Sequence, residues 1–432
     1  MNQNLFDQTS RRNFLKTSAV LGGALISPLG FSAAGAADNE KLKIGLIGCG
    51  GRGTGAASQA LKADSNVVLT AMADVFENNL KNSLSALQKE AADKVQVASD
   101  HCFVGLDGYQ KVIDSGVDVV LLTTPPGFRP QHLKAAVDAG KHIFCEKPVA
   151  TDAPGIRSVL ASVEEAKKKK LALVAGFCWR YNAAERALFQ QIHSGAIGDI
   201  CAIYGTYYTG PVKPMPSANE RPAGMSDTEW QLRNWYNFGW LSGDGLVEQA
   251  VHAVDWIGWA MKDVPPLKCI AVGGRQIPAQ GGNIFDHFEL NYEYANDVRA
   301  FLGCRQQPGC ANDNSATFYG SKGIARELGF SGMPFVKGET NWRFAGERPD
   351  MYQVEHNELF ASIRTGKPIN DGVRLAHSTM MAIMGRMAAY TGQEITWEMA
   401  LNSQESLVPK NLHWDAALPA KPMAMPGQTK FI

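Results

Sequence analysis

Two segments hold side chains that suit proton transfer. The first reads Cys145-Glu146-Lys147-Pro148 and follows an apolar run. A lysine at the end of a buried strand can act as an acid or base, or donate a hydrogen bond to a substrate hydroxyl. A Lys–Glu pair on the surface of a loop is the alternative interpretation.

The second segment, GDGLVEQAVHAVDW at 243–256, places Glu248, His252 and Asp255 at i, i+4 and i+7. On a helix these positions share one face, so two carboxylates would flank an imidazole as a proton-transfer set. Glu248 and His252 also have metal-ligand spacing, but no third ligand is evident in the sequence, and we predict no metal. A half-buried helix whose polar residues are satisfied by neighbours explains the same pattern.

Glycines follow an apolar run in LKIGLIGCGGRG at 42–53, which predicts a strand, a tight turn and a helix start. Gly48, Gly50 and Gly53 have GxGxxG spacing. The first glycine permits the turn, the second lets a pyrophosphate approach the backbone, and the third allows close helix–strand packing. The phosphates would lie at the helix N-terminus, where free N–H groups favour anions. This pattern predicts a dinucleotide site, and another kind of Gly-rich loop is the alternative.

The second predicted strand lies within NVVLTAMAD at 66–74 and ends in Asp74. A carboxylate at this distance from the glycines suits the hydroxyls of the adenosine ribose. Asp74 therefore favours NAD. Arg52 could approach the 2′-phosphate of NADP, so NADP stays open.

The elements that must position these residues alternate between strand and helix from about Asp38 to Val149. The expected strands are 42–47, 67–74, 117–124 and 141–148, and the expected helices are 77–91, 129–140 and 152–170. This alternation is typical of a doubly wound parallel sheet that binds ligands at the carboxyl ends of its strands. The predicted fold class is α/β, with a Rossmann domain at residues 38–165.

The pattern changes in the remainder of the chain, residues 166–432. A strand at 171–177 and a helix at 183–194 precede expected strands at 200–209, 267–274, 286–294, 298–304 and 316–319. No helix separates the last three, so we expect a C-terminal α+β domain with a large, mostly antiparallel open sheet. We expect helices at 352–365 and 373–391 at the end of this domain. We expect the domain to bind substrate and to mediate oligomerisation.

The first residues of the chain read as a leader. A twin-arginine block, SRRNFLK at 10–16, precedes an Ala-, Gly- and Leu-rich stretch, and Ala34-Gly35-Ala36 fits a cleavage site. We predict a Tat signal over residues 1–37, a periplasmic protein, and no membrane partner once the signal is removed. Lys and Arg together number 42, as do Asp and Glu, so no charge excess favours nucleic acid.

Together, GLIGCGGRG, the TTPP segment at 123–126, CEKP and a later helix with a carboxylate four residues before a histidine resemble the glucose–fructose oxidoreductase / inositol dehydrogenase (Gfo/Idh/MocA) family. The resemblance covers about residues 41–401. It implies a Rossmann domain, then an α/β domain whose sheet makes oligomer contacts, and hence a homodimer or homotetramer.

The resemblance also implies roles for individual residues. His252 would accept the hydroxyl proton as hydride leaves the neighbouring carbon, and Lys147 would assist. Asp255 would orient His252. Glu248 stands where many relatives have Asp, and its extra methylene would move the charge. The segment WRYN at 179–182 resembles the family's Arg-aromatic-Asn step beside the cofactor.

The predicted site residues fall into three sets. The catalytic set is Lys147, His252, Glu248 and Asp255. The cofactor-binding set is Gly48, Gly50, Gly51, Arg52, Gly53, Asp74, Thr123, Thr124, Pro125, His132, Glu146, Lys147 and Arg180. The substrate set is Lys147, Tyr181, Tyr236 and His252.

An exported nicotinamide enzyme has no pool of free cofactor, so NAD loaded before export would stay bound and be regenerated in the site. We therefore expect an NAD(P)-dependent oxidoreductase that acts on a carbohydrate hydroxyl. One alternative is an NAD-dependent glycoside hydrolase that works by transient oxidation and elimination, as some relatives do. The Thr-His-Gly type of site sequence of that branch is not found here. A non-catalytic binding protein of the same fold is the third hypothesis, and the intact Lys147 and His252 argue against it.

Overall fold

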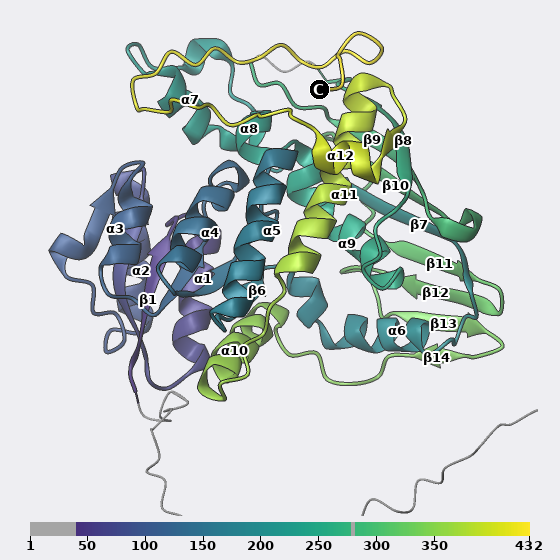
Figure 1. The fold of residues 1–432 in the computed structure, drawn as a ribbon, viewed down its shortest axis with the longest axis horizontal. Coiled ribbons are helices and arrows are strands. Elements are labelled where there is room, and N and C mark those ends of the chain that lie inside the picture. Colours follow the sequence, from purple (N-terminus) through teal and green to yellow (C-terminus); the bar gives the residue numbers. More distant parts are fainter. Residues whose placement is uncertain (1–39, 278–280) are drawn as a thin grey trace, which may run out of the picture. The chain divides into compact units, whose positions relative to one another are not determined.

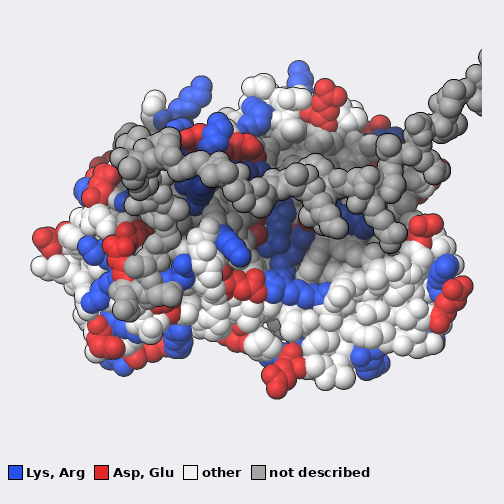
Figure 2. Space-filling model, turned by 60° about the horizontal axis from the view of Figure 1, so that its bottom comes forward, with Lys and Arg blue, Asp and Glu red and all other residues white. Residues whose placement is uncertain are grey.

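A computed structural model describes residues 40–277 and 281–432 of the chain. The predicted Tat signal lies outside these residues. Among the described helices, none is long and apolar enough to cross a membrane. Figure 2 shows one face of the protein, on which basic and acidic side chains are interspersed around the rim and basic side chains gather in the hollow at the centre.

The described N-terminal residues form a parallel sheet in the order β3-β2-β1-β4-β5-β6. Its strands are β1 (Leu42–Ile47), β2 (Val67–Asp74), β3 (Cys102–Val104), β4 (Val119–Leu122), β5 (His142–Cys145) and β6 (Leu173–Ala175). The helices between them are α1 (Gly51–Ala63), α2 (Glu77–Glu90), α3 (Gly108–Asp114), α4 (Arg129–Asp138) and α5 (Ala153–Lys168). All four residues of β4 are buried, as expected for a Val/Leu run covered by helices on both faces. The predicted Rossmann fold is confirmed.

A second, mixed sheet follows in the order β14-β13-β12-β11-β7-β10-β9-β8-β15 (Figure 1). Its strands are β7 (Ile200–Thr209), β8 (Lys268–Gly274), β9 (His287–Glu293), β10 (Arg299–Gln306), β11 (Ala316–Gly320), β12 (Gly323–Glu327), β13 (Phe335–Gly338), β14 (Trp342–Arg343) and β15 (Ile395–Thr396). Neighbouring strands are antiparallel except β7 and β10, which pair in parallel. The predicted mostly antiparallel sheet is confirmed, although β12 to β15 are absent from the sequence-based expectation.

The remaining α-helices of the described chain follow β6. They are α6 (Ala183–His193), α7 (Asp227–Arg233), α8 (Gly239–Ser242), α9 (Val251–Ala260), α10 (Met351–Arg364), α11 (Gly372–Thr391) and α12 (Trp397–Asn402). Helix α6 is the one that leads from the first sheet to the second. Helix α11 packs on both α5 and β8, and Figure 1 shows α5 and α11 side by side. Helix α10 returns to pack on α1.

The first sheet extends beyond the predicted domain boundary at residue 165. Helix α5 carries the chain back to the sheet, where β6 pairs in parallel with β5. The carboxylate of Asp152 caps α5 by accepting a hydrogen bond from the Gly155 N–H at 2.8 Å. The first sheet therefore ends at Ala175.

Candidate active site

The glycine-rich turn joins β1 to α1. Gly48 has a φ of +99°, which L side chains rarely adopt. A Cβ on Gly53 would lie 1.9 Å from the Gly48 carbonyl oxygen, so the helix can approach the strand this closely only with glycine. A Cβ on Gly50 or Gly51 would meet no atom within 4 Å, so the space above the N-terminus of α1 is open. No side chain caps this helix, and its first turn has no acidic residue. This cradle fits a dinucleotide pyrophosphate.

Asp74 lies at the end of β2 beside this cradle. One carboxylate oxygen accepts the Cys49 N–H at 2.7 Å, and the other accepts the Phe76 N–H at 2.8 Å. Burial raises the pKa of Asp74, and these hydrogen bonds oppose the shift. The carboxylate is thus fixed at the place where the adenosine ribose is expected.

Arg52 does not face Asp74. Its guanidinium donates to Glu146, to Glu355 of α10 at 2.8 Å and to Gln59 at 2.9 Å. Two carboxylates already bind this cation, which argues against the expectation that Arg52 could approach a 2′-phosphate.

NADH should bind at least about tenfold more tightly than NADPH, because the 2′-phosphate would meet the Asp74 carboxylate, and Arg52 is paired with Glu146 and Glu355. Quenching of protein fluorescence on titration with each nucleotide measures the two dissociation constants. Asp74→Asn is the matched variant, since the amide oxygen can still accept the Cys49 N–H. In this variant the dissociation constants of NADH and NADPH should differ less. Equal affinities in the unmodified protein would contradict the prediction.

Lys147, which follows β5 of the first sheet, contacts Glu248, which precedes α9. The Lys147 Nζ donates to the Glu248 backbone oxygen at 2.6 Å and lies 3.4 Å from a Glu248 carboxylate oxygen. Both side chains are largely buried. An ammonium group has three N–H donors, so one stays available for a substrate oxygen beyond these two contacts.

A chain of hydrogen bonds holds the other oxygen of Glu248. The Gln249 side-chain amide donates to it at 2.7 Å, and the Tyr207 hydroxyl of β7 donates to the Gln249 amide oxygen at 2.8 Å. The extra methylene of Glu, compared with the Asp of many relatives, therefore still leaves the carboxylate beside Lys147.

His252 lies in an aromatic pocket. Its ring centroid is 4.8 Å from that of Trp179 and 5.9 Å from that of Phe177. Its Nδ1 is buried and has no hydrogen-bond partner among the described residues. Burial and, second, the charge of Lys147 lower the pKa of His252 well below its usual range. The imidazole is therefore uncharged at neutral pH and can accept a proton.

Fourteen of the predicted site residues line one cavity of 470 Å³. They are Gly48, Gly50, Gly51, Arg52, Gly53, Asp74, Thr123, Thr124, Pro125, His132, Glu146, Lys147, Glu248 and His252. The glycine cradle and the proton-transfer groups thus share one space, as a bound dinucleotide and its substrate would require. Within the described part of the chain, no cluster of three or more His, Cys, Asp or Glu residues could hold a metal ion.

His132 supports the wall of this cavity without carrying charge. Its ring stacks on Tyr109 at 4.2 Å, and its Nδ1 lies 3.2 Å from the Thr124 hydroxyl oxygen. Burial and, second, the charge of Arg129 lower the pKa of His132 to about 3. His132 is therefore placed to fix Thr124 rather than to exchange protons.

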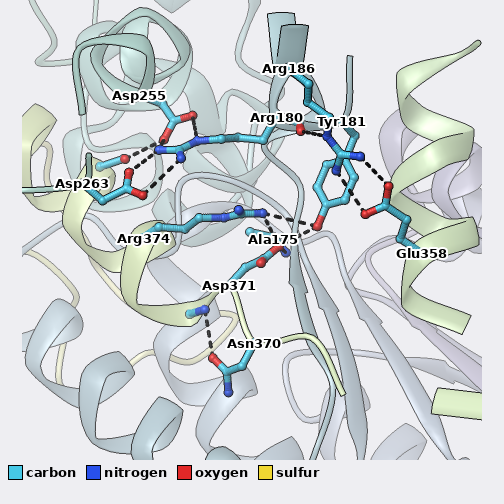
Figure 3. A network of polar contacts seen from close by, with 12 residues as sticks. Ala175, Arg180, Tyr181, Arg186, Asp255, Asp263, Glu358, Asn370, Asp371 and Arg374 are labelled. Carbon is cyan, nitrogen blue, oxygen red and sulfur yellow. Dashed lines mark hydrogen bonds and ion pairs between the residues drawn. The ribbon is translucent and has the colours of Figure 1, made fainter. Parts of the chain in front are cut away.

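Asp255 and Arg180 lie outside the cavity and bind each other (Figure 3). The Arg180 guanidinium donates to both Asp255 oxygens at 2.8 Å and also pairs with Asp263. The Ser378 hydroxyl donates to Asp255 at 2.7 Å. The predicted contacts of Asp255 with His252, and of Arg180 with the cofactor, are wrong. His252 and Asp255 both lie in α9, after a π-helical turn (Leu246–Ala250), and Asp255 faces Arg180 and Ser378 instead of His252.

Tyr181 and Tyr236 are also placed away from the cavity. The Tyr181 hydroxyl donates to Asp371 at 2.6 Å, as Figure 3 shows. The Tyr236 hydroxyl donates to the Gln306 amide oxygen at 2.9 Å. Both side chains are buried and satisfied, so the predicted substrate contacts are wrong.

Several cavity residues are missing from the sequence-based set. They are mainly Trp179, Tyr207, Trp235, Gln249, Phe330 and Tyr352. Gln249 adjoins Glu248 in the sequence, and Trp179 adjoins Arg180. This neighbourhood to predicted site residues is the signal from which Gln249 and Trp179 could have been predicted. Phe330 and Tyr352 come from distant segments and have no such signal.

Comparison with family models gives two matches. A model described as "Oxidoreductase family, NAD-binding Rossmann fold" matches residues 42–176, and one described as "GFO/IDH/MocA C-terminal domain" matches residues 186–326. These two ranges contain the glycine cradle, Lys147, Glu248 and His252.

Named relatives agree with these matches. Inositol 2-dehydrogenase of Serratia proteamaculans is 31% identical over 356 residues, covering 78% of this chain and 91% of the relative. A glycosyl hydrolase family 109 protein of Solibacter usitatus is 28% identical over 45% of this chain and 44% of the relative. With further inositol dehydrogenases, the chain spans 42% to 57% of their length. The structure of levoglucosan dehydrogenase with NADH and levoglucosan shares the fold, with a TM-score of 0.65, 19% identity, and coverage of 83% and 99% of the two chains.

Proposed function

Because the chain belongs to the Gfo/Idh/MocA family of oxidoreductases, whose N-terminal domain is an NAD-binding Rossmann fold, we propose that it oxidises a hydroxyl group of a sugar or cyclic polyol with NAD that stays bound. A second substrate then takes the hydride back, which regenerates the NAD in the site. One observation carries the proposal. An uncharged histidine and a buried lysine face the same cavity as the glycine cradle. The relative named inositol 2-dehydrogenase supports the polyol or sugar class.

The side chains divide the reaction as follows. Bound NAD would accept a hydride from the carbon that carries the reacting hydroxyl. His252 accepts the hydroxyl proton, because its imidazole is held uncharged. The remaining N–H of Lys147 donates to the substrate oxygen and stabilises the negative charge that develops there. Glu248 holds Lys147 in place through two contacts, and the Trp179 ring packs against the His252 ring.

The export and assembly of the protein are further parts of the proposal. We infer a Tat signal at residues 1–37, a periplasmic location and a homodimer or homotetramer. Tyr204, Ile270, Val272 and Tyr319 are exposed on three strands of the C-terminal sheet, and such apolar side chains support a subunit contact.

An absorbance spectrum of protein purified from the periplasmic fraction tests the retained cofactor, the oxidation of a sugar and the export together. We expect a nucleotide to co-purify and to gain the absorbance of reduced nicotinamide when a sugar or inositol from a panel is added. Recovery from that fraction supports export. A protein without nucleotide would contradict retention of the cofactor, and a loaded protein that no sugar reduces would contradict the oxidoreductase.

A glycoside hydrolase that works by transient oxidation and elimination is the second candidate. It is favoured by the relative named glycosyl hydrolase family 109 protein, which matches under half of either chain. Hydrolysis of a 4-nitrophenyl glycoside without any added hydride acceptor would place this candidate first. Net reduction of the bound nucleotide without release of nitrophenol would exclude it for the glycosides tested.

A further inference from the structure

Phe330 is an exposed aromatic side chain at the cavity. Its exposed fraction is 74%, and it is the one exposed large hydrophobic residue of the described chain that lines this cavity. Leaving a phenylalanine in water forgoes the free energy that its burial would contribute. An apolar ring kept in this position therefore suggests a partner that arrives from solvent.

An aromatic path connects Phe330 to the reacting groups. The His252 and Trp179 ring centroids are 4.8 Å apart, and the Trp179 and Phe330 centroids are 6.0 Å apart with the rings edge to face. His252 and Trp179 are buried, whereas Phe330 is exposed, so the path runs from the reacting groups to the solvent. Trp179 also stacks on buried Trp256 at 4.2 Å, which fixes its ring.

The turn that carries Phe330 is held by its own residues. One Glu327 carboxylate oxygen accepts the N–H groups of Leu328 and Gly329 at 3.0 and 2.9 Å. The Ser331 N–H and hydroxyl both donate to the Leu328 carbonyl oxygen, at 3.0 and 2.7 Å. A Cβ on Gly329 would lie 2.3 Å from the Asn314 carbonyl oxygen, so the turn sits tightly on the neighbouring segment. The phenyl ring is thus presented by an ordered turn.

We propose that Phe330 forms the outer wall of the substrate site and makes the enzyme select glycosides, whose second ring stacks on Phe330, over free monosaccharides and free cyclic polyols. The C–H face of a sugar ring or the face of an aryl group packs well against an aromatic side chain. A ring that reacts at His252 covers Trp179, and the next ring outward meets Phe330. This inference rests on the function proposed above, because it assumes a sugar at His252.

Calorimetry on the NADH-loaded protein tests the proposal without turnover. The probes are glucose, galactose and myo-inositol, together with cellobiose and the α- and β-phenyl glycosides of the two sugars. We expect at least one glycoside to bind about tenfold more tightly than its parent sugar. Phe330→Ala should remove this difference and leave the affinity for the parent sugar within twofold. Phe330→Tyr should retain it.

Val264→Ala is the matched control, since Val264 is exposed but does not line the cavity, and it should change neither affinity. No preference in the unmodified protein, no binding of any probe, or a preference that persists in Phe330→Ala would overturn the inference. A preference that depends on Phe330, in a protein that never reduces its nucleotide, would uphold the binding site while contradicting the proposed oxidoreductase.

Discussion

A His252→Asn variant should transfer hydride about 10³-fold more slowly than the unmodified protein, because a positioned general base contributes about 10²–10⁴-fold. Asparagine fills much of the space between Trp179 and Phe177 but cannot accept a proton at neutral pH. Rapid mixing of the NAD-loaded protein with a substrate sugar, followed by the absorbance of reduced nicotinamide, measures this step directly.

NADH affinity is the companion measurement for this variant. The NADH affinity of His252→Asn should stay within about threefold of that of the unmodified protein, because the pyrophosphate is expected at the glycine cradle rather than at His252. His193→Asn serves as the control, since His193 contacts the Trp259 carbonyl oxygen at 2.8 Å and the Phe189 ring, away from the cavity. A His252→Asn variant with an unchanged rate would show that another group accepts the proton.

The pH profile carries the same argument further. The pKa of His252 is lowered by burial and by the charge of Lys147, so the uncharged base should persist below pH 6.5 and the rate should not fall there. In Lys147→Met the nearby charge is gone while burial remains. The acidic limb of the residual activity should then move to higher pH. An acidic limb near 6.5 in the unmodified protein would contradict this assignment.

Local sequence patterns predicted the part of the site that local structure builds. The bounds of β1 and β2 agree residue for residue with the expected strands, because each is a buried apolar run that ends at a glycine turn or an acid. The glycine spacing encodes a turn whose atoms lie within six residues of one another. Lys147 follows β5, whose carboxyl end lies at the same edge of the parallel sheet as those of β1 and β2. Its position near the glycine turn therefore follows from the fold.

The site residues whose predicted contacts differ from the structure are those that pair with residues far away in the sequence. Asp255 has helical spacing from His252, yet Arg180, 75 residues earlier in the chain, binds its carboxylate. Charge and periodicity cannot indicate which of several partners a buried carboxylate will meet. Phe330 lines the cavity from a turn that follows β12 of the C-terminal sheet, and Glu355 contacts Arg52 through the packing of α10 on α1. Short strands such as β14 also depend on their neighbours, since two residues have no period of their own.

Glu355 is the buried group with the largest predicted effect on stability. Its side chain is fully buried on α10, its second oxygen has no partner among the described residues, and Arg52 is the cation that binds it. Burial and, second, the charge of Glu146 raise the pKa of Glu355, whereas Arg52 lowers it. The Arg52 guanidinium also lies over the Tyr352 ring, at 5.0 Å from its centroid.

Arg52→Met should therefore lower the free energy of unfolding by about 3–5 kcal/mol at pH 8, because removal of one partner leaves a buried charge uncompensated. Methionine keeps much of the packing on Tyr352, so the loss reports mainly the charge. Urea unfolding followed by circular dichroism measures the change. Glu355→Gln alone should cost much less, since Arg52 keeps its contact with Glu146, and adding it to Arg52→Met should recover part of the loss.

The sign of the pH dependence separates this explanation from a packing defect. A carboxyl group whose pKa is raised by folding contributes stability at low pH and loses it as the pH rises through the raised pKa. Without Arg52 the pKa of Glu355 is raised further, so the deficit of Arg52→Met should be greatest at pH 8 and shrink toward pH 5, where protonation neutralises the buried group. The double variant should show a smaller change of the deficit with pH than Arg52→Met, because Glu146 alone of the two carboxylates then remains without Arg52. A deficit that is independent of pH in Arg52→Met would indicate lost packing rather than an unpaired carboxylate, and α10 would then be held to the Rossmann domain by its apolar contacts alone.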